Sequence, residues 1–541
     1  MKQYDYIIVG AGSSGAAVAA RLSEDPNCQV LLIEAGGADK TTFMRKPGMI
    51  MVFHTVKQIN QKYDWGYRTE PKPALDNKSI GYYRARVLGG CSSINGMVYV
   101  RGNRKNYDDW AAEGNTGWSY DDVLPYFKKL ENYRSDSSAF RGDSGPINVQ
   151  LSPNPSPITD EWTKGMAQSF ETVVNPDYNG EEQEGASVMQ VNAWKGLRQS
   201  TSVCYLDPIK NGKRENFEIL LTGMVTRVLL EGTKCVGVEI LNKKGQKQEI
   251  RCNKEVILSA GALNSPAILM HSGIGPKAHL QEVGIPCVQD LPVGENLHDH
   301  AFVPLVFNTP LSNNRSTGGY IFRGIMKEYL GGGGSFLEKS MFENVAFVRS
   351  GMGFADGIPD MQVHAMPWAY PPNPNDPGIP TVDKNPSLTI MPTLIYPKSR
   401  GFVRLRSNDP LDKPICDPNY MGDPRDKEFL LHGIDRIRDM MGSNPMSTKH
   451  TGEIEPGPAT FNRDALNKIL SERFCTVYHP VGTCRMGVDD YAVVDPQLRV
   501  RGIENLRVAD CSIMPTISGG NTNVPAIMIG ERAAALIQEG R

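Results

Sequence analysis

The start of the chain alternates between apolar runs and stretches rich in glycine or small residues. Residues 4–9 and 29–34 are short apolar runs, residues 10–15 carry three glycines, and residues 16–23 are mostly small. Short apolar runs are typical of buried strands, and the longer stretch between them suits a helix. The pattern predicts a strand, a tight turn, a helix and a second strand, which together form a βαβ unit.

Further elements follow along the chain. Residues 108–129 are predicted to form one helix, and residues 219–240 two paired strands that turn at Gly232. Residues 255–262 read as a buried strand that ends in small residues, followed by a helix over 265–271. The small residues at the end of this strand predict another place where backbone approaches a ligand.

The pattern changes over residues 301–470, where prolines interrupt alternating segments. We expect this stretch to form a separate lobe built on a sheet. Buried-strand character returns at residues 506–509, and a last helix is predicted from about Pro525 to residue 538, because proline is favourable in a first helical turn.

Length and charge narrow the class of protein. At 541 residues the chain exceeds the size at which one hydrophobic core keeps growing, so two or more lobes are expected. A net charge of −2 gives no global attraction to nucleic acid, which favours small-molecule partners. We find no leader-like start, no apolar run of about 18 residues, and no C-x-x-C pair among the ten cysteines. A cytoplasmic protein with free thiols is expected.

Gly10, Gly12 and Gly15 follow the first predicted strand and open the first predicted helix. Glu34 closes the second strand about 20 residues later, as in dinucleotide-binding βαβ units. In such units the glycines let a pyrophosphate approach the helix N-terminus, and the carboxylate accepts from a ribose hydroxyl. The motif predicts an adenine dinucleotide without a 2′-phosphate, and it does not separate FAD from NAD.

The chain resembles the glucose-methanol-choline (GMC) oxidoreductase family, and its choline dehydrogenase-like alcohol dehydrogenases in particular, nearly from end to end. Six ordered blocks carry the resemblance, at residues 10–15 with 34–36, 86–98, 259–276, 292–300, 478–487 and 493–531. The implied fold is mixed α/β: a Rossmann-type FAD-binding domain and a discontinuous second domain built on an antiparallel sheet flanked by helices. The expected boundaries are 1–155, 215–305 and 470–541 for the FAD-binding domain, and 156–214 and 306–469 for the substrate-binding domain.

The resemblance also implies FAD, with residues 95–98 near the isoalloxazine, Val225 near the adenine, and Asp510 near the ribityl chain and pyrophosphate. The residues expected to bind the cofactor are Gly10, Gly12, Ser13, Ser14, Gly15, Glu34, Ala35, Arg86, Gly89, Gly90, Ser93, Asn95, Gly96, Met97, Val98, Val225, Ala260, Asp510, Cys511, Asn523 and Pro525. Relatives that attach FAD covalently use a histidine where this chain has Ile94, so non-covalent FAD is expected.

The catalytic pair implied by the resemblance is His479, in the motif Tyr478-His479-Pro480, and Asn521. Oxidation of an alcohol removes the hydroxyl proton and a hydride from carbon, and a neutral imidazole near pH 7 is suited to receive the proton. An amide can donate a hydrogen bond to the developing alkoxide. Asn523 either orients the flavin ring or caps the last helix, and the sequence leaves both interpretations open.

Other polar residues have less specific signals. His298 and His300 stand two apart without a third ligand nearby in sequence, so no metal is expected. Glu343 and His364 resemble family positions that can face the substrate, and Tyr478 is a third candidate. A solvated glutamate and an internally bonded sheet histidine remain the alternatives.

The predicted activity is oxidation of a primary alcohol to an aldehyde by hydride transfer to FAD, with oxygen, a quinone or another carrier as electron acceptor. A non-redox FAD-containing lyase on the same scaffold is the alternative. The aromatic residues Trp65, Trp368, Tyr370 and Tyr478 could serve aryl alcohols, aliphatic alcohols or a quaternary ammonium group. The sequence leaves the substrate, the oligomeric state and peripheral membrane contact open.

Overall fold

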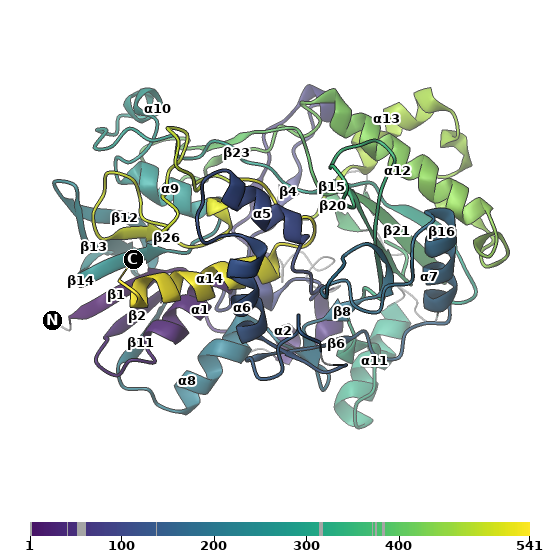
Figure 1. Ribbon diagram of the computed structural model, residues 1–541, viewed down its shortest axis with the longest axis horizontal. Helices are drawn as coiled ribbons and strands as arrows, with labels where there is room; N and C mark the ends of the chain where they lie inside the picture. The colour runs from purple at the N-terminus through teal and green to yellow at the C-terminus, as the bar shows by residue number, and fades with distance from the viewer. Residues whose placement is uncertain are drawn as a thin grey trace.

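Two β-sheets lie next to each other along the long axis of the molecule, and both chain ends lie beside the first sheet (Figure 1). The structure is a computed structural model that describes residues 3–39, 42–50, 61–136, 138–312, 318–370, 372–373, 376–380 and 385–540. Its mixed α/β architecture confirms the predicted fold class, a Rossmann-type unit with a second, antiparallel sheet. The exact domain boundaries stay a prediction.

The first sheet has the strand order β11-β2-β1-β14-β13-β12, and β26 also pairs with β14. The pairs β11–β2, β2–β1, β1–β14 and β14–β26 are parallel, and β12 and β13 form an antiparallel extension of the sheet. The bounds are β1 Tyr4–Val9, β2 Val30–Glu34, β11 Phe217–Leu221, β12 Met224–Glu231, β13 Lys234–Leu241, β14 Lys247–Leu258 and β26 Leu506–Val508. With α1 (Ser13–Leu22) between β1 and β2, the predicted βαβ unit is confirmed.

Two sequence predictions in this part of the fold are wrong in detail. The hairpin turns near Gly232 as predicted, but residues 219–221 belong to β11, which pairs with β2 instead. The helix predicted over 108–129 is two helices, α5 (Arg104–Ala112) and α6 (Tyr120–Leu130). Gly114 and Gly117 between them have φ values of +97° and +86°, a left-handed conformation that ends a helix.

The second sheet is antiparallel and has the order β24-β16-β21-β18-β17-β7, with β15 pairing both β21 and β25. Its strands are β7 Gly185–Val188, β15 Ala301–Phe302, β16 Leu305–Asn308, β17 Asn344–Val348, β18 Met361–Met366, β21 Ser387–Leu394, β24 Gly452–Glu455 and β25 Cys475–Thr476. Both central strands, β18 and β21, are buried over their whole length. This confirms a sheet within the predicted separate lobe.

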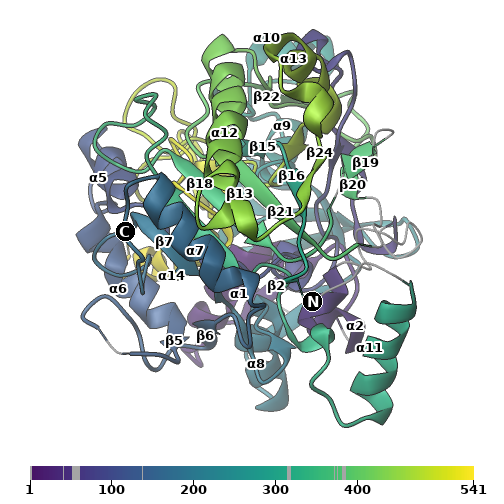
Figure 2. The same cartoon turned by 90° about the vertical axis from the view of Figure 1, so that its right-hand side faces the viewer.

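Helices cover both sheets. The last helix, α14 (Asn523–Gln538), packs on α1 beside the first sheet (Figure 1), and Gly530 allows this close approach because a β-carbon there would meet Ser14 O at 2.4 Å. Over the second sheet lie α7 (Ile158–Ser169) and α12 (Pro424–Gly442) (Figure 2). The other helices are α2 Thr42–Arg45, α8 Asp207–Asn211, α9 Asn264–His271, α10 Lys277–Glu282, α11 Gly318–Leu330 and α13 Arg463–Arg473.

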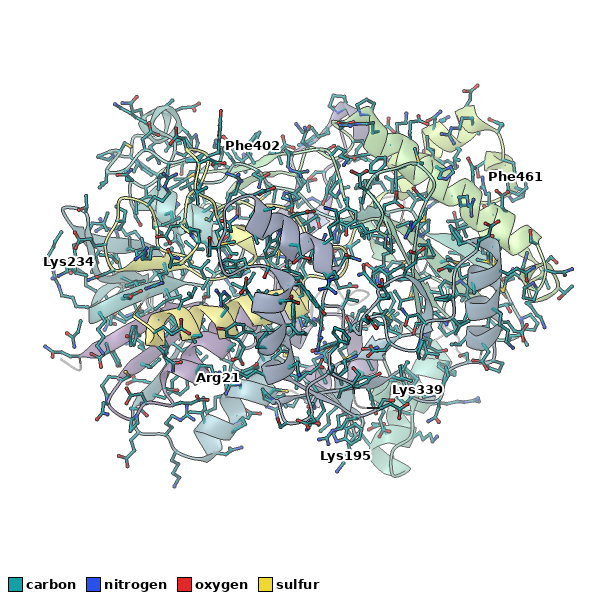
Figure 3. All side chains as sticks on the ribbon, in the orientation of Figure 1. Arg21, Lys195, Lys234, Lys339, Phe402 and Phe461 are labelled. Carbon is teal, nitrogen blue, oxygen red and sulfur yellow. The ribbon has the colours of Figure 1, made fainter. Side chains whose placement is uncertain are left out.

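Short paired strands lie within the loops around these layers. They are β3 Tyr67–Arg68, β4 Gly81–Tyr82, β5 Glu131–Tyr133, β6 Ile147–Leu151, β8 Gln190–Val191, β9 Ala193–Trp194, β10 Leu197–Arg198, β19 Pro372–Asn373, β20 Asp376–Pro380, β22 Phe402–Arg404 and β23 Ile415–Asp417. Charged side chains are spread over the outside, with Lys234 at one end and Lys195 and Lys339 along another edge (Figure 3). Among the described helices, none combines the length and apolar character needed to span a bilayer.

Candidate functional site

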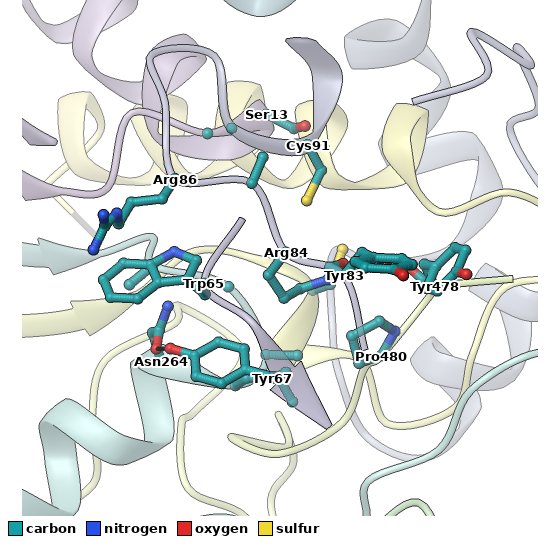
Figure 4. A pocket seen from close by; sticks show the side chains of 18 of the residues that line it. Ser13, Trp65, Tyr67, Tyr83, Arg84, Arg86, Cys91, Asn264, Tyr478 and Pro480 are labelled. Atoms are coloured by element: carbon teal, nitrogen blue, oxygen red, sulfur yellow. Dashed lines mark hydrogen bonds between the residues drawn. The ribbon is translucent and has the colours of Figure 1, made fainter. Parts of the chain in front are cut away.

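A cavity of about 510 Å³ connects the glycine-rich turn of the βαβ unit with the second sheet. Its lining comes from chain segments far apart in sequence, including the turn after β1, the end of β2, the start of α14, and strands β18 and β21. Figure 4 shows part of it, with Ser13 and Cys91 on one side and Trp65, Arg84 and Tyr478 on the other. The cavity has two chemically distinct ends.

The three glycines of the first turn have different structural roles. Gly10 has φ +97°, and a β-carbon there would meet Ser259 O at 2.6 Å; at Gly15 it would meet Gly10 O at 2.0 Å. Both glycines are therefore required by packing within the protein. At Gly12, which lines the cavity, a β-carbon would meet only Gly90 Cα at 3.9 Å. Gly12 instead leaves room for a ligand at the N-terminus of α1.

Glu34 is buried at the edge of the same end of the cavity. Its two carboxylate oxygens accept hydrogen bonds from Ala11 N at 3.0 Å and Gly36 N at 2.7 Å. Burial raises the pKa of Glu34 to about 7. Each oxygen retains a lone pair that can accept from a ribose hydroxyl, so the residue suits the role predicted for it.

An unpartnered hydroxyl at this end of the cavity is suited to a ligand with hydrogen-bond acceptors. The Ser14 hydroxyl is buried at the first turn of α1 and has no hydrogen-bond partner, although it lies on the cavity. A buried hydroxyl without a partner is costly unless a ligand supplies one. Together with the space over Gly12 and the acceptors of Glu34, this donor fits the phosphates and ribose of an adenine dinucleotide.

Asn523 does not cap the last helix. α14 begins at Asn523 itself, its N-cap Thr522 makes no side-chain cap bond, and Asn523 Oδ1 accepts from Ser13 Oγ at 2.7 Å. The cap interpretation is therefore wrong, whereas the predicted last helix is confirmed and begins two residues before Pro525. Asn523 instead ties the start of α14 to the glycine-rich turn, and both residues line the cavity.

Asp510 organises the neighbouring wall. Its Oδ2 accepts from Gly261 N at 2.8 Å and from Ser265 Oγ at 2.6 Å, and its Oδ1 accepts from Ser512 N at 2.8 Å. The carboxylate thus holds the loop after β14 against the segment after β26. This explains why the small residues that follow β14 reach the cavity, as the sequence predicted.

Most of the residues predicted for the cofactor line the cavity. These are Gly10, Gly12, Ser13, Ser14, Glu34, Ala35, Arg86, Gly90, Asn95, Gly96, Met97, Val98, Val225, Ala260, Asp510, Cys511 and Asn523, and Ile94 lies among them. Gly15, Gly89, Ser93 and Pro525 do not line it. Gly89 and Ser93 support the lining from behind, since Ser93 Oγ donates to Leu88 O at 2.8 Å.

Trp65 lies at the dinucleotide end and not beside His479. Its ring stacks on Tyr67 at a centroid distance of 5.9 Å, and the guanidinium of Arg86 lies 5.5 Å from its centroid. Tyr478 lies on the other side of Arg84 (Figure 4). Of the four aromatic residues considered for the substrate, Tyr370 and Tyr478 line the cavity near His479, whereas buried Trp368 packs behind that wall.

Two histidines, His364 and His479, line the other end of the cavity, and His300 lies buried behind them. His300 Nδ1 lies 3.0 Å from His479 Nδ1, and His300 Nε2 lies 3.1 Å from Ile395 O. Burial lowers the pKa of His300 to about 3, so its ring is neutral and carries one proton. A carbonyl oxygen only accepts, so that proton sits on Nε2, and His300 Nδ1 accepts from His479 Nδ1–H. His479 is left with an unprotonated Nε2, the form of a general base.

An amide faces this nitrogen. Asn521 Nδ2 lies 3.3 Å from His479 Nε2. Its Oδ1 accepts from Gln362 Nε2 at 3.0 Å and from His364 Nε2 at 3.2 Å, which fixes the orientation of the amide. An oxygen atom placed beside both groups could donate its proton to His479 and accept from Asn521. The arrangement is complementary to an alcohol hydroxyl.

Residues 298–300 form a support for His479 rather than a metal site. His298 Nδ1 contacts Asn296 O at 2.6 Å, its Nε2 accepts from Ile517 N at 2.9 Å, and both ring nitrogens are thereby used. Asp299 Oδ1 accepts from His479 N at 2.7 Å. The parts of the chain that the structure describes contain no cluster of three or more residues suited to a metal.

The three residues predicted to face the substrate do not all lie on the cavity. His364 and Tyr478 line the cavity beside His479, and His364 bonds to Asn521. Glu343 does not line the cavity, because its carboxylate accepts from Ser156 N at 2.6 Å and Thr159 Oγ1 at 2.8 Å behind the sheet. Burial raises the pKa of Glu343. The structure does not bring Glu343 to the cavity.

Sequence reasoning missed Arg84, which lines the cavity between the two ends (Figure 4). Its guanidinium donates to the carbonyl oxygens of Tyr83 and Tyr478. Within the described residues, no carboxylate forms an ion pair with it. The basic pair Arg84 and Arg86 just before a glycine-rich loop was the available signal, and only Arg86 was identified.

Comparisons with known proteins identify the family of the chain. Two family models described as GMC oxidoreductase match residues 4–302 and 397–530. The chain is 39% identical over 543 residues to an oxygen-dependent choline dehydrogenase of Sinorhizobium medicae, covering 98% of this chain and 95% of that protein. Among solved structures, pyridoxine 4-oxidase from Mesorbium loti superposes with a TM-score of 0.87 at 28% identity, covering 99% of both chains. A variant of Aspergillus oryzae formate oxidase superposes with a TM-score of 0.90 at 25% identity, covering 100% of this chain and 99% of that one.

Proposed function

Because the chain belongs to the GMC oxidoreductase family, and is thereby an FAD-dependent oxidoreductase acting on CH–OH donors, we propose that it oxidises a primary alcohol to an aldehyde, with His479 as the base and Asn521 as the donor to the substrate oxygen. The observation that carries the proposal is the pair His479 Nε2 and Asn521 Nδ2, an acceptor and a donor 3.3 Å apart on the cavity.

The proton and the hydride of the alcohol go to different acceptors. The hydroxyl proton moves to His479 Nε2, which the contact with His300 keeps unprotonated. Asn521 donates to the oxygen as negative charge develops there. FAD, when bound, accepts the hydride from the carbon. The products are an aldehyde, a protonated His479 and a cofactor reduced by two electrons, so the step balances.

The proposed cofactor contacts are the cavity residues around Gly12, Ser14, Glu34 and Asn523, within a domain formed by residues 1–155, 215–305 and 470–541. Residues 156–214 and 306–469 form the proposed substrate domain, which supplies Gln362 and His364. Support comes from the unpartnered Ser14 hydroxyl at one end and the histidine cluster at the other.

The direct test is anaerobic mixing of the purified holoenzyme with a panel of alcohols while the flavin absorbance is followed. Bleaching by a primary alcohol, with release of the aldehyde, is the expected result. Conversion of an added compound without bleaching would favour the lyase alternative. Rapid return of colour in air would identify oxygen as the acceptor, and return only with a quinone would identify a quinone-type acceptor.

We propose that FAD is held without a covalent bond, because the residue on the cavity at the position of a linking histidine is Ile94, which has no nucleophilic atom. Acid precipitation of the holoenzyme should leave all of the yellow colour in the supernatant. Colour that stays with the pelleted polypeptide after washing in denaturant would disprove this.

The rate of flavin reduction should be flat with pH around neutrality. Burial, reinforced by nearby His300 and Arg84, lowers the pKa of His479 well below its usual 6.5. The neutral ring is the base, so activity is present above this pKa and is lost only as the pH falls through it. Stopped-flow reduction between about pH 6 and pH 9 should vary less than about threefold, since the reference histidine pKa is about 6.5. A rate that falls with a midpoint near pH 7 would contradict a depressed pKa.

His300 is proposed as a positioning residue that sets the tautomer of His479. His300→Phe removes the acceptor for His479 Nδ1–H and should slow flavin reduction roughly 10- to 100-fold, less than loss of the base itself. In His300→Gln, the side-chain oxygen can accept from His479 while the amide nitrogen donates to Ile395 O. This variant should recover most of the rate. Equal losses in the two variants, at full FAD content, would mean that His300 acts only through packing.

A further inference from the structure

The wall of the cavity beside the catalytic pair is built by two paired strands of the second sheet. Gln362, His364 and Met366 alternate along β18, so their side chains share one face. Met391 on β21 stands directly opposite His364 in the register of the two strands. Both methionines are buried and line the cavity. The sheet that positions Asn521 therefore continues as an apolar surface.

The remaining wall at this end is also apolar. Its members line the cavity and pack with Met366 and Met391 in one hydrophobic cluster; they are Ile50, Phe302, Met341, Phe342, Tyr370 and Val477. The polar groups beside this wall include the phenols of Tyr83, Tyr370 and Tyr478, the hydroxyl of Thr476, and the amide and imidazole groups around His479. A substrate substituent that leaves water here contacts thioether, aromatic and aliphatic groups.

Acidic side chains on the cavity lie elsewhere. Within the described residues, the carboxylates that line it are Glu34, Asp412 and Asp510. Glu34 and Asp510 are bonded to backbone N–H groups at the dinucleotide end. Asp412 accepts from Ser407 in an exposed loop, next to Lys413, which donates to Gly66 O beside Trp65. None of the three belongs to the apolar wall.

A positive charge lines the cavity beside the reacting end. Arg84 donates to the carbonyl of Tyr478, and its field contributes to the lowered pKa of His479. A cationic substrate would lose its hydration here without gaining a carboxylate partner, and it would also be repelled by the guanidinium. Contacts with aromatic faces recover only part of that loss. A neutral apolar substituent loses no comparable hydration and gains from burial.

We propose that the substrate is an uncharged primary alcohol whose substituent is a hydrocarbon, and that quaternary ammonium alcohols are poor substrates. This inference rests on the proposed function, because it describes what the same site accepts. The apolar wall formed by Met366, Met391 and the residues packed with them is its specificity determinant.

A matched pair of alcohols tests the inference. Choline and 3,3-dimethylbutan-1-ol have nearly the same shape and differ in replacing a charged nitrogen by carbon. Anaerobic stopped-flow reduction of the holoenzyme should reach half-saturation with 3,3-dimethylbutan-1-ol at a concentration at least about tenfold below that for choline, a difference within the range expected of an uncompensated charge. Half-saturation by choline at an equal or lower concentration would overturn the inference but leave alcohol oxidation intact. If no alcohol in a panel including benzyl alcohol and 1-hexanol bleaches the flavin, the proposed function itself fails, and the inference with it.

A second comparison tests the wall itself. Met366→Glu and Met366→Gln have similar shapes and differ in whether the new group can ionise beside a bound cation. Met366→Glu should lower the half-saturating concentration of choline at least about tenfold relative to Met366→Gln, as expected for a charge that gains a partner. It should raise that of 3,3-dimethylbutan-1-ol. If Met366→Glu and Met366→Gln have the same half-saturating concentration for each of the two alcohols, Met366 does not face the substituent. If either variant loses FAD, the comparison of the two alcohols on the wild-type holoenzyme decides alone.

Discussion

Replacing His479 by alanine is expected to leave FAD bound but to slow reduction of the flavin by alcohol roughly 10²- to 10⁴-fold, the range for loss of a positioned acid-base group. The reason is geometric. His479 Nε2 is an unprotonated acceptor that faces Asn521 Nδ2 on the cavity, and burial lowers its pKa, so it is ready to take a proton at neutral pH. Stopped-flow spectroscopy of protein with a verified FAD content measures the step directly.

His271 offers a matched control. It also lines the cavity and also has a lowered pKa, about 4, but it lies at the end of α9 rather than in the histidine cluster. His271→Ala should reduce its flavin within about threefold of the wild-type rate, because it removes no group that handles a proton. A His479→Ala variant that also stays within threefold would show that His479 is structural and that the mechanism is wrong.

Local sequence signals were sufficient to predict the dinucleotide end of the cavity. Gly10, Gly12 and Gly15 lie within one turn, and the strand, helix and acid that give the motif meaning are close in sequence. The structure confirms that βαβ unit and shows that only Gly12 leaves space for a ligand, whereas Gly10 and Gly15 are fixed by backbone contacts. That division of roles depends on atoms of Ser259 and could not be read from the motif.

The reacting end depends on contacts between distant segments. His300 was considered only as a metal ligand, because its link to His479 joins residues 179 positions apart. Gln362 gave no signal, since its role follows from the alternation of β18 and from the position of Asn521 against the face of that strand that carries Gln362 and His364. For Glu343 the opposite happened. Its sequence position resembles one that can face the substrate, but its side chain points to Ser156 and Thr159.

Loss of the Asn521 amide should have the next largest effect. Asn521→Ala is expected to slow flavin reduction roughly 10²-fold, somewhat less than loss of His479, because removal of one donor to a developing oxyanion typically costs 10²- to 10³-fold and water can replace part of it. In the parent protein Gln362 and His364 both donate to the amide oxygen, which holds the amide nitrogen toward His479, and this donor is lost in the variant.

Asn521→Asp separates hydrogen-bond donation from packing. Aspartate keeps the size of the side chain and can still accept from Gln362 and His364, but its second oxygen cannot donate to the substrate. We expect this variant to lose at least as much rate as Asn521→Ala. Asn264→Ala is the control, because Asn264 lines the cavity at the dinucleotide end, where its Oδ1 accepts from Tyr67 at 2.5 Å. Stopped-flow reduction at matched FAD content compares the three. If Asn521→Asp keeps the wild-type rate, the amide serves only to fill space, and the alkoxide must be stabilised by another group.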